Sequence, residues 1–434
     1  MRQGCETCRQ IYHKESGYNG TREETLKELI LISITGVDRP GITATVTRTL
    51  AKFNANVLDI GQAVIHDALS LGMLVHLPGP GGVEVVQEAV QHTITELGNL
   101  TVRFLPIDEA SYAGWVGRQG KPRHIVTLLA RQITAYQISR LAEVIVSYGL
   151  NIDKINRLSG RIPLESLGND SRAAIEFSLR GPVADVASLR SDFMKLANEM
   201  DVDIAYQQDN VFRRHRRLLA FDMDSTLIQT EVIDELAKRA GVGAQVAAIT
   251  ERAMRGEMDF KRSLTERVAL LKGLPESALA EVAVTLPLTE GAERLLNTVK
   301  RLGYKTAILS GGFTYFGRVL QKRFGIDYVF ANDLEIENGV VSGRISGEVV
   351  DGDRKAELLT RIVQKENISL EQVIAVGDGA NDLPMLSIVG LGIAFRAKPI
   401  VKAAVKQSLS LGLDGILYLM GLRDRETINE LTNE

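Results

Sequence analysis

Four short groups of polar residues in the second half of the chain carry side chains suited to phosphoryl transfer. They are, in chain order, Asp222-Met223-Asp224, Ser310-Gly311-Gly312, Lys355, and Asp378-Gly379-Ala380-Asn381-Asp382. One carboxylate can attack phosphorus and form an acyl phosphate, while a second can protonate the leaving oxygen. A lysine, a hydroxyl and backbone N–H groups can neutralise the phosphoryl oxygens, and Mg²⁺ prefers carboxylate ligands. The set therefore indicates chemistry on a phosphate ester.

The order and spacing of the groups suggest a role for each. Asp222 can be the nucleophile, and Asp224, on the same side of an extended chain, can act as acid and then base. Lys355 and Ser310 suit the phosphoryl oxygens, and Asp222 and Asp378 suit Mg²⁺ together with a backbone carbonyl and waters. Each motif alone is also typical of a turn or a helix N-terminus, so the prediction rests on their combination.

Apolar runs precede three of the four groups and predict the elements that position them. The runs are Leu218–Phe221, Thr306–Leu309 and Val373–Val376. They lack polar alternation, which is typical of parallel strands buried on both faces. Ligands of open α/β sheets bind beyond the carboxyl ends of such strands, so the polar groups are expected to meet there.

The segment from about Arg217 to the C-terminus resembles the haloacid dehalogenase superfamily, and within it the phosphoserine phosphatases, through these same motifs. The resemblance implies a Rossmann-like domain, with a parallel sheet between helices, and a Mg²⁺-dependent phosphatase activity. The roles it implies are the nucleophile Asp222, the acid and base Asp224, the phosphate-binding Ser310 and Gly311, the charge-neutralising Lys355, the metal ligand Asp378, the backbone carbonyl of Asp224 as a further metal ligand, and Asp382 as a supporting acid.

Residues 231–288 read as mostly helical and resemble the small cap of that superfamily, which limits access and excludes water. Phosphoserine carries an ammonium and a carboxylate, for which Glu231 and Arg267 are suitable partners. The resemblance places both at substrate-binding positions, together with the apolar Met254 and Phe260 and the polar Asn381. The alternative is that Glu231 and Arg267 are ordinary helix charges.

The first half of the chain repeats itself with an offset of 95 positions. Leu29–Thr35 matches His124–Ala130, and Asn56–Ile60 matches Asn151–Ile155. A constant offset indicates a duplicated domain, each copy reading as strand, helix, strand, strand, helix, strand. Both copies resemble ACT domains, ferredoxin-like α+β modules that bind amino acids and regulate metabolic enzymes.

In the first copy, the loop after the first strand is a candidate regulatory site. Its residues are Gly36, Asp38, Arg39, Pro40 and Gly41, and L-serine is the effector that the resemblance suggests. The alternative is an ordinary turn. The second copy has Ala130-Arg131-Gln132 there and lacks the glycines, so it is expected to serve mainly as an interface. Pairing of ACT sheet edges predicts a homodimer.

The expected domain limits follow from these patterns. They are a flexible tail at 1–24, ACT domains at 25–106 and 121–208, and the phosphatase domain at 214–434 with its cap at about 231–288. The stretch 106–121 reads as a linker, and the basic run Arg213–Arg217 as a solvated linker. Glu337-Asn338-Gly339-Val340 predicts a hairpin, which is either a flap near the site or scaffold.

Composition narrows the class of protein. The net charge of −3 and pI near 6.2 show no basic bias, which argues against a nucleic-acid partner. No apolar run is long enough to span a bilayer, so a cytoplasmic protein without a membrane partner is expected. Cys5 and Cys8 stand in the polar tail without further ligands to complete a zinc site.

Three functions are compatible with these features. The first is hydrolysis of O-phospho-L-serine to L-serine and phosphate through an aspartyl phosphate, the last step of serine biosynthesis, with feedback through the ACT domains. The second is hydrolysis or transfer of phosphate on another small monoester. The third is an amino-acid sensor with a vestigial phosphatase half, against which the intact catalytic residues argue.

Overall fold

The computed structural model describes residues 28–78, 82–118, 120–166 and 171–428. The predicted tail at 1–24, with Cys5 and Cys8, lies outside these residues. The chain divides into two compact units, Met1–Gly120 and Lys121–Glu434, each taken by itself below. No helix of the described ranges is long and apolar enough to cross a membrane.

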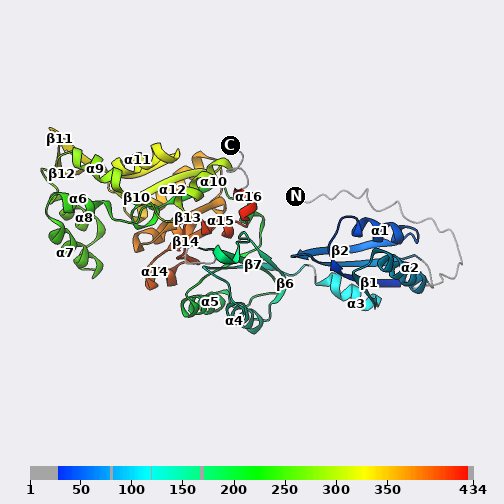
Figure 1. Ribbon diagram of the computed structural model, residues 1–434. Coiled ribbons are helices and arrows are strands. Elements are labelled where there is room, and N and C mark those ends of the chain that lie inside the picture. Colours follow the sequence, from blue (N-terminus) through cyan, green and yellow to red (C-terminus); the bar gives the residue numbers. More distant parts are fainter. Residues whose placement is uncertain (1–27, 79–81, 119, 167–170, 429–434) are drawn as a thin grey trace, which may run out of the picture. The chain divides into compact units, whose positions relative to one another are not determined.

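The first unit contains the first predicted α+β domain (Figure 1). Its elements are β1 (Glu28–Val37), α1 (Ile42–Ala51), β2 (Asn56–Ile65), β3 (Ala68–Leu77), α2 (Gly82–Leu97) and β4 (Leu100–Ile107). The strands are antiparallel in the order β2-β3-β1-β4. Alternate apolar side chains of β1 and β3 pack against α1 and α2, as the period of two requires.

The predicted linker at 106–121 contains a helix, α3 (Glu109–Gly117), which the sequence reasoning missed. Its N-cap is Asp108, whose side chain accepts a hydrogen bond from the Ser111 N–H at 2.7 Å. The three glycines of the stretch suggested a loop, but a capped first turn outweighed their low helix propensity.

The second unit opens with the repeated domain, and its topology confirms the duplication. The elements are β5 (Arg123–Ala130), α4 (Ala135–Ser147), β6 (Asn151–Arg157), β7 (Ala173–Arg180), α5 (Val186–Met200) and β8 (Asp203–Gln208). The strand order β6-β7-β5-β8 is that of the first copy. We call this second copy ACT2 and the copy in the first unit ACT1.

A mostly parallel sheet forms the centre of the rest of the unit. Its order is β12-β11-β10-β9-β13-β14-β15. The strands are β9 (Leu218–Phe221), β10 (Lys305–Phe313), β11 (Tyr328–Glu337), β12 (Val340–Ser346), β13 (Val373–Gly377), β14 (Leu391–Phe395) and β15 (Gln407–Leu409). In β9, Leu219 and Phe221 face one hydrophobic cluster while Leu218 and Ala220 face another, so both faces of this strand are buried as predicted.

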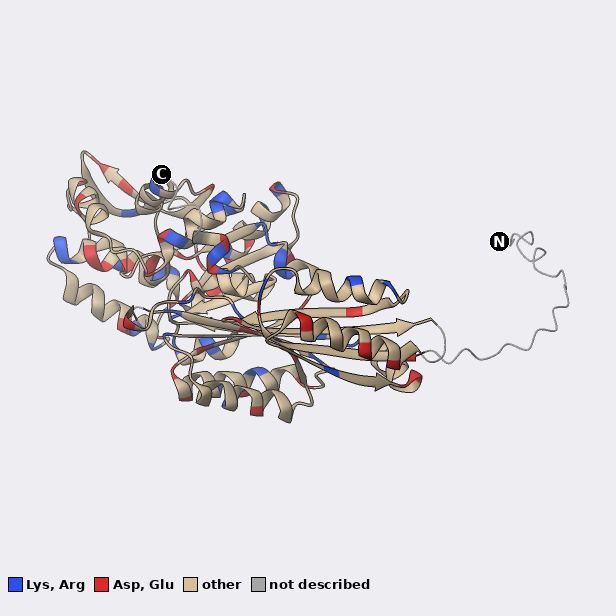
Figure 2. Cartoon of the chain, turned by 45° about the vertical axis from the view of Figure 1, so that its right-hand side comes forward, with Lys and Arg blue, Asp and Glu red and all other residues tan. Residues whose placement is uncertain are grey.

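Helices cover both faces of this sheet. Those of the body are α10 (Ala292–Arg301), α11 (Thr314–Phe324), α12 (Gly352–Lys365), α13 (Leu383–Ile388), α14 (Pro399–Ala404), α15 (Gly415–Leu419) and α16 (Asp424–Ile428). Those of the cap, green in Figure 1, are α6 (Val232–Arg239), α7 (Gly243–Met254), α8 (Phe260–Ala269) and α9 (Ser277–Thr285). In the view of Figure 2, acidic and basic residues are interspersed along the chain.

The predicted hairpin joins β11 to β12. Asn338 and Gly339 have φ of 52° and 80°, the left-handed pair that a tight two-residue turn requires. The hairpin packs on the cap, because Val340 forms a bridge with Pro275 and the Gly343 backbone lies against α8 and the turn after it. It therefore supports the cap.

The basic run Arg213–Arg217 is only in part the solvated linker that was predicted, because Arg213 and Arg216 are buried. Arg213 is 1% exposed and pairs with Glu176 of β7, while Arg216 donates to the backbone carbonyl of Glu371. Arg213 thus pairs with a residue of ACT2, Arg216 bonds to the backbone before β13, and Arg214 and Arg217 are exposed. Local sequence carries no information on such long-range partners.

ACT2 is joined to the body at the edge strands β8 and β15. The Gln407 side chain accepts a hydrogen bond from the Tyr206 N–H at 3.0 Å and donates to the Tyr206 carbonyl. The Asp203 carboxylate accepts from the backbone N–H groups of Ser410 at 2.9 Å and Leu411 at 3.1 Å. The edge of the ACT2 sheet is thus covered within the same chain.

The buried pair of Arg213 and Glu176 yields a prediction about stability. Replacing Arg213 by Ala leaves the Glu176 carboxylate buried without its partner, which should destabilise the protein by about 3–5 kcal/mol. Urea unfolding measures the loss. The double variant Arg213→Met, Glu176→Leu should recover most of it, because apolar side chains of similar volume need no ion pair. An unchanged unfolding midpoint in Arg213→Ala would contradict this role.

Candidate active site

Three parallel strands bring the predicted catalytic groups to one edge of the sheet. Phe221, the last residue of β9, is in register with Ile308 of β10 and Val376 of β13. Asp222 directly follows this register position, and Ser310 and Asp378 each stand two residues beyond it on the neighbouring segments. The Asp222 N–H donates to the Val376 carbonyl at 2.9 Å. The carboxyl ends of the strands meet as the sequence predicted.

Lys355 lies beneath this edge and is fully buried. It stands in the first turns of α12, whose N-cap Asp351 accepts from the Arg354 N–H at 2.9 Å. Lys355 Nζ lies 3.0 Å from Asp222 Oδ2 and 2.7 Å from Asp382 Oδ1. Burial alone would lower the pKa of Lys355, but Asp222 and Asp382 raise it above its usual value. The lysine is therefore a fixed positive charge beside Asp222, the predicted nucleophile.

The carboxylates outnumber this one lysine. Burial, then Asp382, raise the pKa of Asp222 to about 8, although Lys355 opposes the shift. Burial and Asp382 likewise raise the pKa of Asp378 to about 7. Carboxylate oxygens of Asp222, Asp378 and Asp382 lie within 4.8 Å of one another. Uncompensated negative charge and oxygen donors at this spacing fit a hard divalent cation.

Asp224 lies at the start of the cap rather than in the carboxylate cluster. Its Oδ1 accepts from the Val232 N–H at 3.0 Å, at the N-terminus of α6. Burial raises the pKa of Asp224, and Glu231 and Asp222 raise it further. The next residue, Ser225, has φ of 55°, a left-handed conformation that is strained for a residue with a side chain. The raised pKa favours the protonated form of Asp224, which stands where the cap begins.

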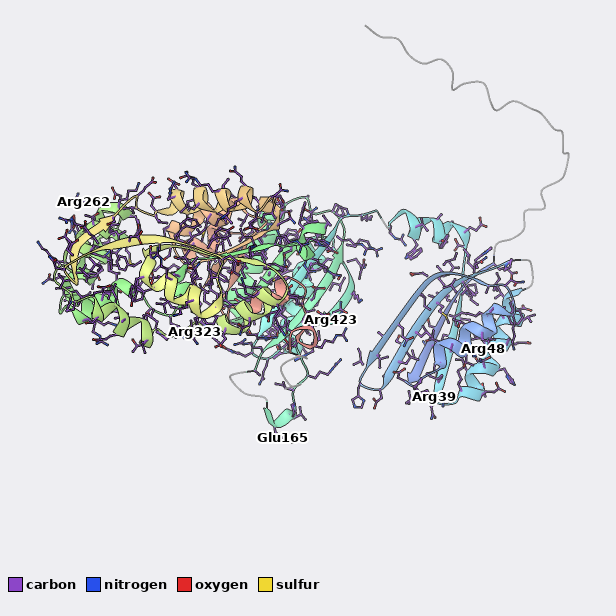
Figure 3. The ribbon with its side chains drawn as sticks, turned by 90° about the horizontal axis from the view of Figure 1, so that it is seen from above. Arg39, Arg48, Glu165, Arg262, Arg323 and Arg423 are labelled. Carbon is purple, nitrogen blue, oxygen red and sulfur yellow. The ribbon has the colours of Figure 1, made fainter. Side chains whose placement is uncertain are left out.

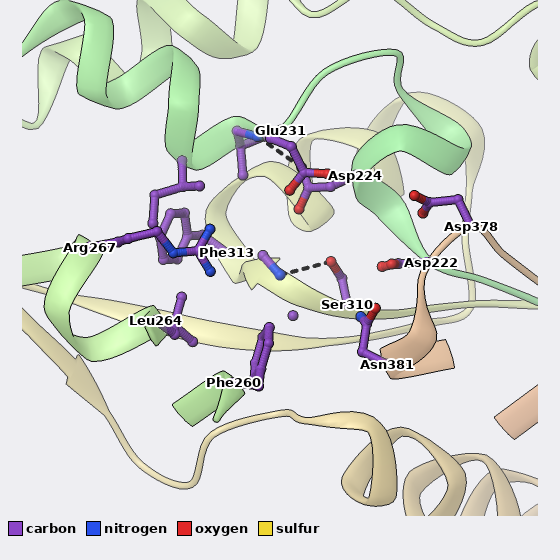
Figure 4. Close-up of a pocket in the computed structure, with 14 residues that line it drawn as sticks. Asp222, Asp224, Glu231, Phe260, Leu264, Arg267, Ser310, Phe313, Asp378 and Asn381 are labelled. Carbon is purple, nitrogen blue, oxygen red and sulfur yellow. Dashed lines mark hydrogen bonds between the residues drawn. The ribbon is translucent and has the colours of Figure 1, made fainter. Parts of the chain in front are cut away.

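A cavity of about 120 Å³ opens over these groups and is covered by the cap (Figure 4). It is lined by Asp222, Asp224, Glu231, Val232, Ile233, Phe260, Leu264, Arg267, Ser310, Gly311, Gly312, Phe313, Asp378 and Asn381. Nine of the predicted site residues line it. Lys355 and Asp382 lie behind Asp222. So small a cavity suits a small substrate.

Met254 is the predicted substrate contact that the structure does not bring to the cavity. Its side chain is 64% exposed at the end of α7, and its sulfur lies 3.7 Å from Lys398 Nζ. Glu231 and Arg267 both face the cavity, from the N-cap of α6 and from α8 (Figure 4). The Ser225 hydroxyl donates to Glu231 at 2.8 Å, which fixes the glutamate near Asp224.

Family models agree with this division of the chain. A haloacid dehalogenase-like hydrolase model matches residues 217–390, and ACT domain models match residues 28–104 and 122–207. A phosphoserine phosphatase of Streptomyces coelicolor is 41% identical over 92% of this chain and 93% of its own. That of Mycobacterium tuberculosis is 39% identical over 91% and 94%. The chain belongs to the phosphoserine phosphatase family.

Solved structures extend the similarity to the fold. A probable phosphoserine phosphatase from Vibrio cholerae covers 68% of this chain and 86% of its own, with 34% identity and a TM-score of 0.55. A hydrolase of the same superfamily from Salmonella enterica serovar Typhi covers 68% and 98%, with 31% identity and a TM-score of 0.59.

Several residues that shape the site were not singled out from the sequence. Thr226 donates from its hydroxyl to Asp378 at 3.2 Å and so orients a candidate metal ligand. A Cβ on Gly312 would lie 2.1 Å from Asp224 Oδ2, so only glycine fits there. The Asn332 amide, 1% exposed, donates to the Gly311 carbonyl at 2.8 Å and accepts from the Val350 N–H at 2.8 Å. Only Thr226 and Gly312 carried a signal, because they adjoin recognised motifs.

In ACT1, the predicted ligand loop lines a shallow hollow. It is formed by residues 38–44 and Gln62. Gly36 does not line it. Its own Cβ would meet the Asn99 carbonyl at 2.2 Å, so this glycine is needed for packing against the backbone before β4. Gly41 has φ of 95° and forms the N-cap of α1. Arg39, in the same loop, is exposed (Figure 3).

The raised pKa of Asp222 predicts how stability depends on pH without metal. In the folded protein this carboxyl keeps its proton up to about pH 8, whereas the unfolded chain loses it near pH 4. The unfolded state therefore binds fewer protons between these values, and stability falls as pH rises through that window. Asp222→Asn removes this titrating carboxyl and so removes its contribution to the pH dependence. Its melting temperature in chelator, relative to wild type, should rise by a few degrees between pH 5 and 8. A difference that stays constant or falls over this range would contradict the shift.

Proposed function

We propose that this protein hydrolyses O-phospho-L-serine to L-serine and phosphate, the last step of serine biosynthesis, through a phosphoryl group carried on Asp222. The observation that carries the proposal is the pairing of Asp222 with Lys355 at the floor of a small cavity whose cap side presents Glu231 and Arg267. The similarity to the two relatives named above as phosphoserine phosphatases covers nearly the whole length of both chains, which supports the same activity.

The first half of the reaction uses the charges on the sheet edge. An Asp222 oxygen attacks phosphorus in line with the serine oxygen, while Lys355, the Ser310 hydroxyl and backbone N–H groups of the loop neutralise the phosphoryl oxygens. The bond between phosphorus and the serine oxygen breaks. Asp224, kept protonated by its raised pKa, donates its proton to that oxygen, so serine leaves as the neutral alcohol.

The second half reverses the role of Asp224. As a carboxylate it takes a proton from a water molecule, and the resulting hydroxide attacks the phosphorus of the acyl phosphate. The bond between phosphorus and Asp222 breaks, which releases inorganic phosphate and restores the nucleophile. Mg²⁺ would be held by Asp222, Asp378 and the backbone carbonyl of Asp224, with Asp382 in support, and would supply positive charge to the phosphoryl oxygens.

The preference for phosphoserine rests on the two charged residues of the cap. Glu231 suits the α-ammonium and Arg267 the α-carboxylate, while Phe260 closes the cavity beside Gly311. Burial lowers the pKa of Arg267, although Glu231, Asp234 and Asp224 counteract it, so its charge is held in a poorly solvated place. The attraction between this guanidinium and a substrate carboxylate is stronger there than it would be in water.

We further infer a cytoplasmic homodimer in which ACT1 binds L-serine as a feedback signal. Asp38 can receive the ammonium, and the N–H groups at the start of α1 suit the carboxylate. Strand β2 lies at the edge of its sheet and is exposed along its length, with Val57, Ile60 and Val64 among its exposed side chains. Such an edge favours pairing with a second copy.

A substrate panel tests the proposed reaction. Wild-type protein with Mg²⁺ should release phosphate from phosphoserine with a higher kcat/KM than from phosphothreonine, phosphoglycolate or sugar phosphates. Arg267→Gln should lower kcat/KM for phosphoserine about 10- to 200-fold, because a charge-assisted contact contributes ~1.5–3 kcal/mol. Phosphate esters without a carboxylate should be little affected.

The matched control is Arg262→Gln on the same helix. Arg262 is exposed and paired with Glu266, away from the cavity, and Figure 3 labels it on the cap. It should behave as wild type. A panel in which another monoester is preferred, with Arg267→Gln unaffected, would assign the site to a different substrate.

Calorimetry tests the feedback site in the full-length chain. Because serine is also the product, the titration uses Arg267→Gln, in which the active site binds serine weakly. L-serine should still give a binding isotherm in that variant, and Asp38→Ala added to it should abolish the isotherm, since the ammonium loses its partner. Asp59→Ala, on the exposed β2, is the control and should leave binding unchanged. Equal heats with and without Asp38→Ala would refute binding at this loop.

A further inference from the structure

The cap is joined to the body by two segments that pair with each other. The Gln229 N–H donates to the Pro287 carbonyl at 2.9 Å, and the Thr289 N–H donates to the Leu227 carbonyl at 3.0 Å. We call these paired segments the cap hinge: residues 227–229 and 287–289. Leu227 stands three positions after Asp224, so the hinge is continuous with the catalytic loop.

Glu290, the residue directly after the hinge, is held by three arginines. Its carboxylate accepts from Arg131 Nη1 at 2.9 Å and Nη2 at 3.1 Å, a bidentate pair. Arg172 donates to it at 2.7 Å and Arg396 at 3.2 Å. Arg131 and Arg172 belong to ACT2, whereas Arg396 follows β14 of the body. Through Glu290, ACT2 therefore contacts the segment that leads from the cap back to the body.

This contact is stronger than an ordinary surface ion pair. Hydrogen bonds from Arg131, against the opposing effect of burial and with help from Arg172, lower the pKa of Glu290 to about 2. The Glu290 side chain is 33% exposed, so solvent screens it only in part. A bidentate pair within a network loses less conformational freedom per contact than an isolated pair does.

The turn that follows is fixed as well. The Glu290 carbonyl accepts from the Leu413 N–H at 2.9 Å. Gly291 has φ of 78°, and a Cβ there would lie 2.1 Å from the buried carboxylate of Asp414. Arg294 donates to that carboxylate at 3.0 Å, and Arg172 pairs with it too. The hinge thus ends on a rigid anchor shared by ACT2 and the body.

Comparison of the two copies shows which loop of ACT2 supplies the contact with Glu290. Arg131 stands 95 positions after Gly36, the same offset that relates the two copies (131 minus 36 is 95). The loop that lines a hollow in ACT1 therefore carries, in ACT2, the arginine that contacts Glu290. Arg131 thus stands at the position of one of the two glycines that the second copy lacks.

We propose that Glu290 is a positioning residue through which ACT2 sets the cap hinge, and with it the closed cap. Its kinetic part rests on the proposed phosphatase function. Glu231 and Arg267 stand on the cap, so they reach the substrate only when the cap is closed. Loosening the hinge lowers the closed fraction, and the apparent affinity for phosphoserine falls by that fraction. A substrate without ammonium or carboxylate, such as p-nitrophenyl phosphate, depends less on the cap.

The test compares Glu290→Gln and Arg131→Gln with a control, Arg140→Gln. Arg131 and Arg140 both belong to ACT2 and have side chains 35% and 34% exposed, but Arg140 pairs with Glu199, away from the hinge. In the first two variants KM for phosphoserine should rise about 3- to 10-fold with kcat little changed. KM for p-nitrophenyl phosphate should stay within about twofold. The control should match wild type.

Hydrogen exchange gives a readout that needs no turnover. The amides of Gln229 and Thr289, which close the hinge, should exchange faster in Glu290→Gln and Arg131→Gln but not in Arg140→Gln. Unchanged exchange and KM in the first two variants would overturn the proposal. So would an equal loss of kcat on both substrates with normal KM, which a general loss of stability produces. A wild type inactive on both substrates would refute the phosphatase function, and exchange would still decide the role of Glu290.

Discussion

A buried lysine beside a carboxylate nucleophile is the constraint on which the rest of the active site depends. Lys355 has no contact with solvent, and burying a lone ammonium would be very unfavourable. Asp222 and Asp382 make it tolerable, and the lysine in turn holds Asp222 in place. Once these three are fixed, the adjoining Asp378 forms no ion pair of its own within the described part of the chain, and Lys355 only partly offsets its charge. This excess of negative charge fits the edge of the sheet to the divalent cation that we propose, which would in turn offset the charge of the phosphoryl group.

The backbone of the fold is arranged to permit this crowding. Gly377 and Gly312 stand where a Cβ would collide with Asp382 and Asp224, at 2.4 Å and 2.1 Å. Strands β9, β10 and β13 are in register at Phe221, Ile308 and Val376, so the polar side chains that follow these positions lie close together although they come from separate segments. The strain at Ser225 falls in the same loop, where chain direction changes from the sheet to the cap. The crowded and strained groups lower stability locally, and the large hydrophobic cores on both faces of the sheet offset this loss.

Sequence reasoning reached what depends on local pattern. The parallel strands, the duplicated α+β domain and the hairpin at Asn338-Gly339 are each encoded by short runs, and the structure has them. Helix α3 was missed because its glycines were weighed above the Asp108 cap. The burial of Arg213 and the contact of Arg131 with Glu290 could not be seen, since both depend on partners more than 35 positions away. The direction of Met254, toward Lys398 and away from the cavity, is likewise set by packing and not by local sequence.

The central claim is that phosphorus becomes bonded to Asp222, and mass spectrometry of the trapped intermediate tests it most directly. Asp224→Asn lacks both the acid for the serine oxygen and the base that activates water, so it is mixed with p-nitrophenyl phosphate, whose leaving group needs no proton. With Mg²⁺ and an acid quench, the acyl phosphate should accumulate in this variant. The account predicts an added phosphoryl group that maps to the peptide containing residue 222, and none when Asp222→Asn is combined with it. A phosphoryl group on another residue, or phosphate release by Asp222→Asn at a rate near that of wild type, would contradict it.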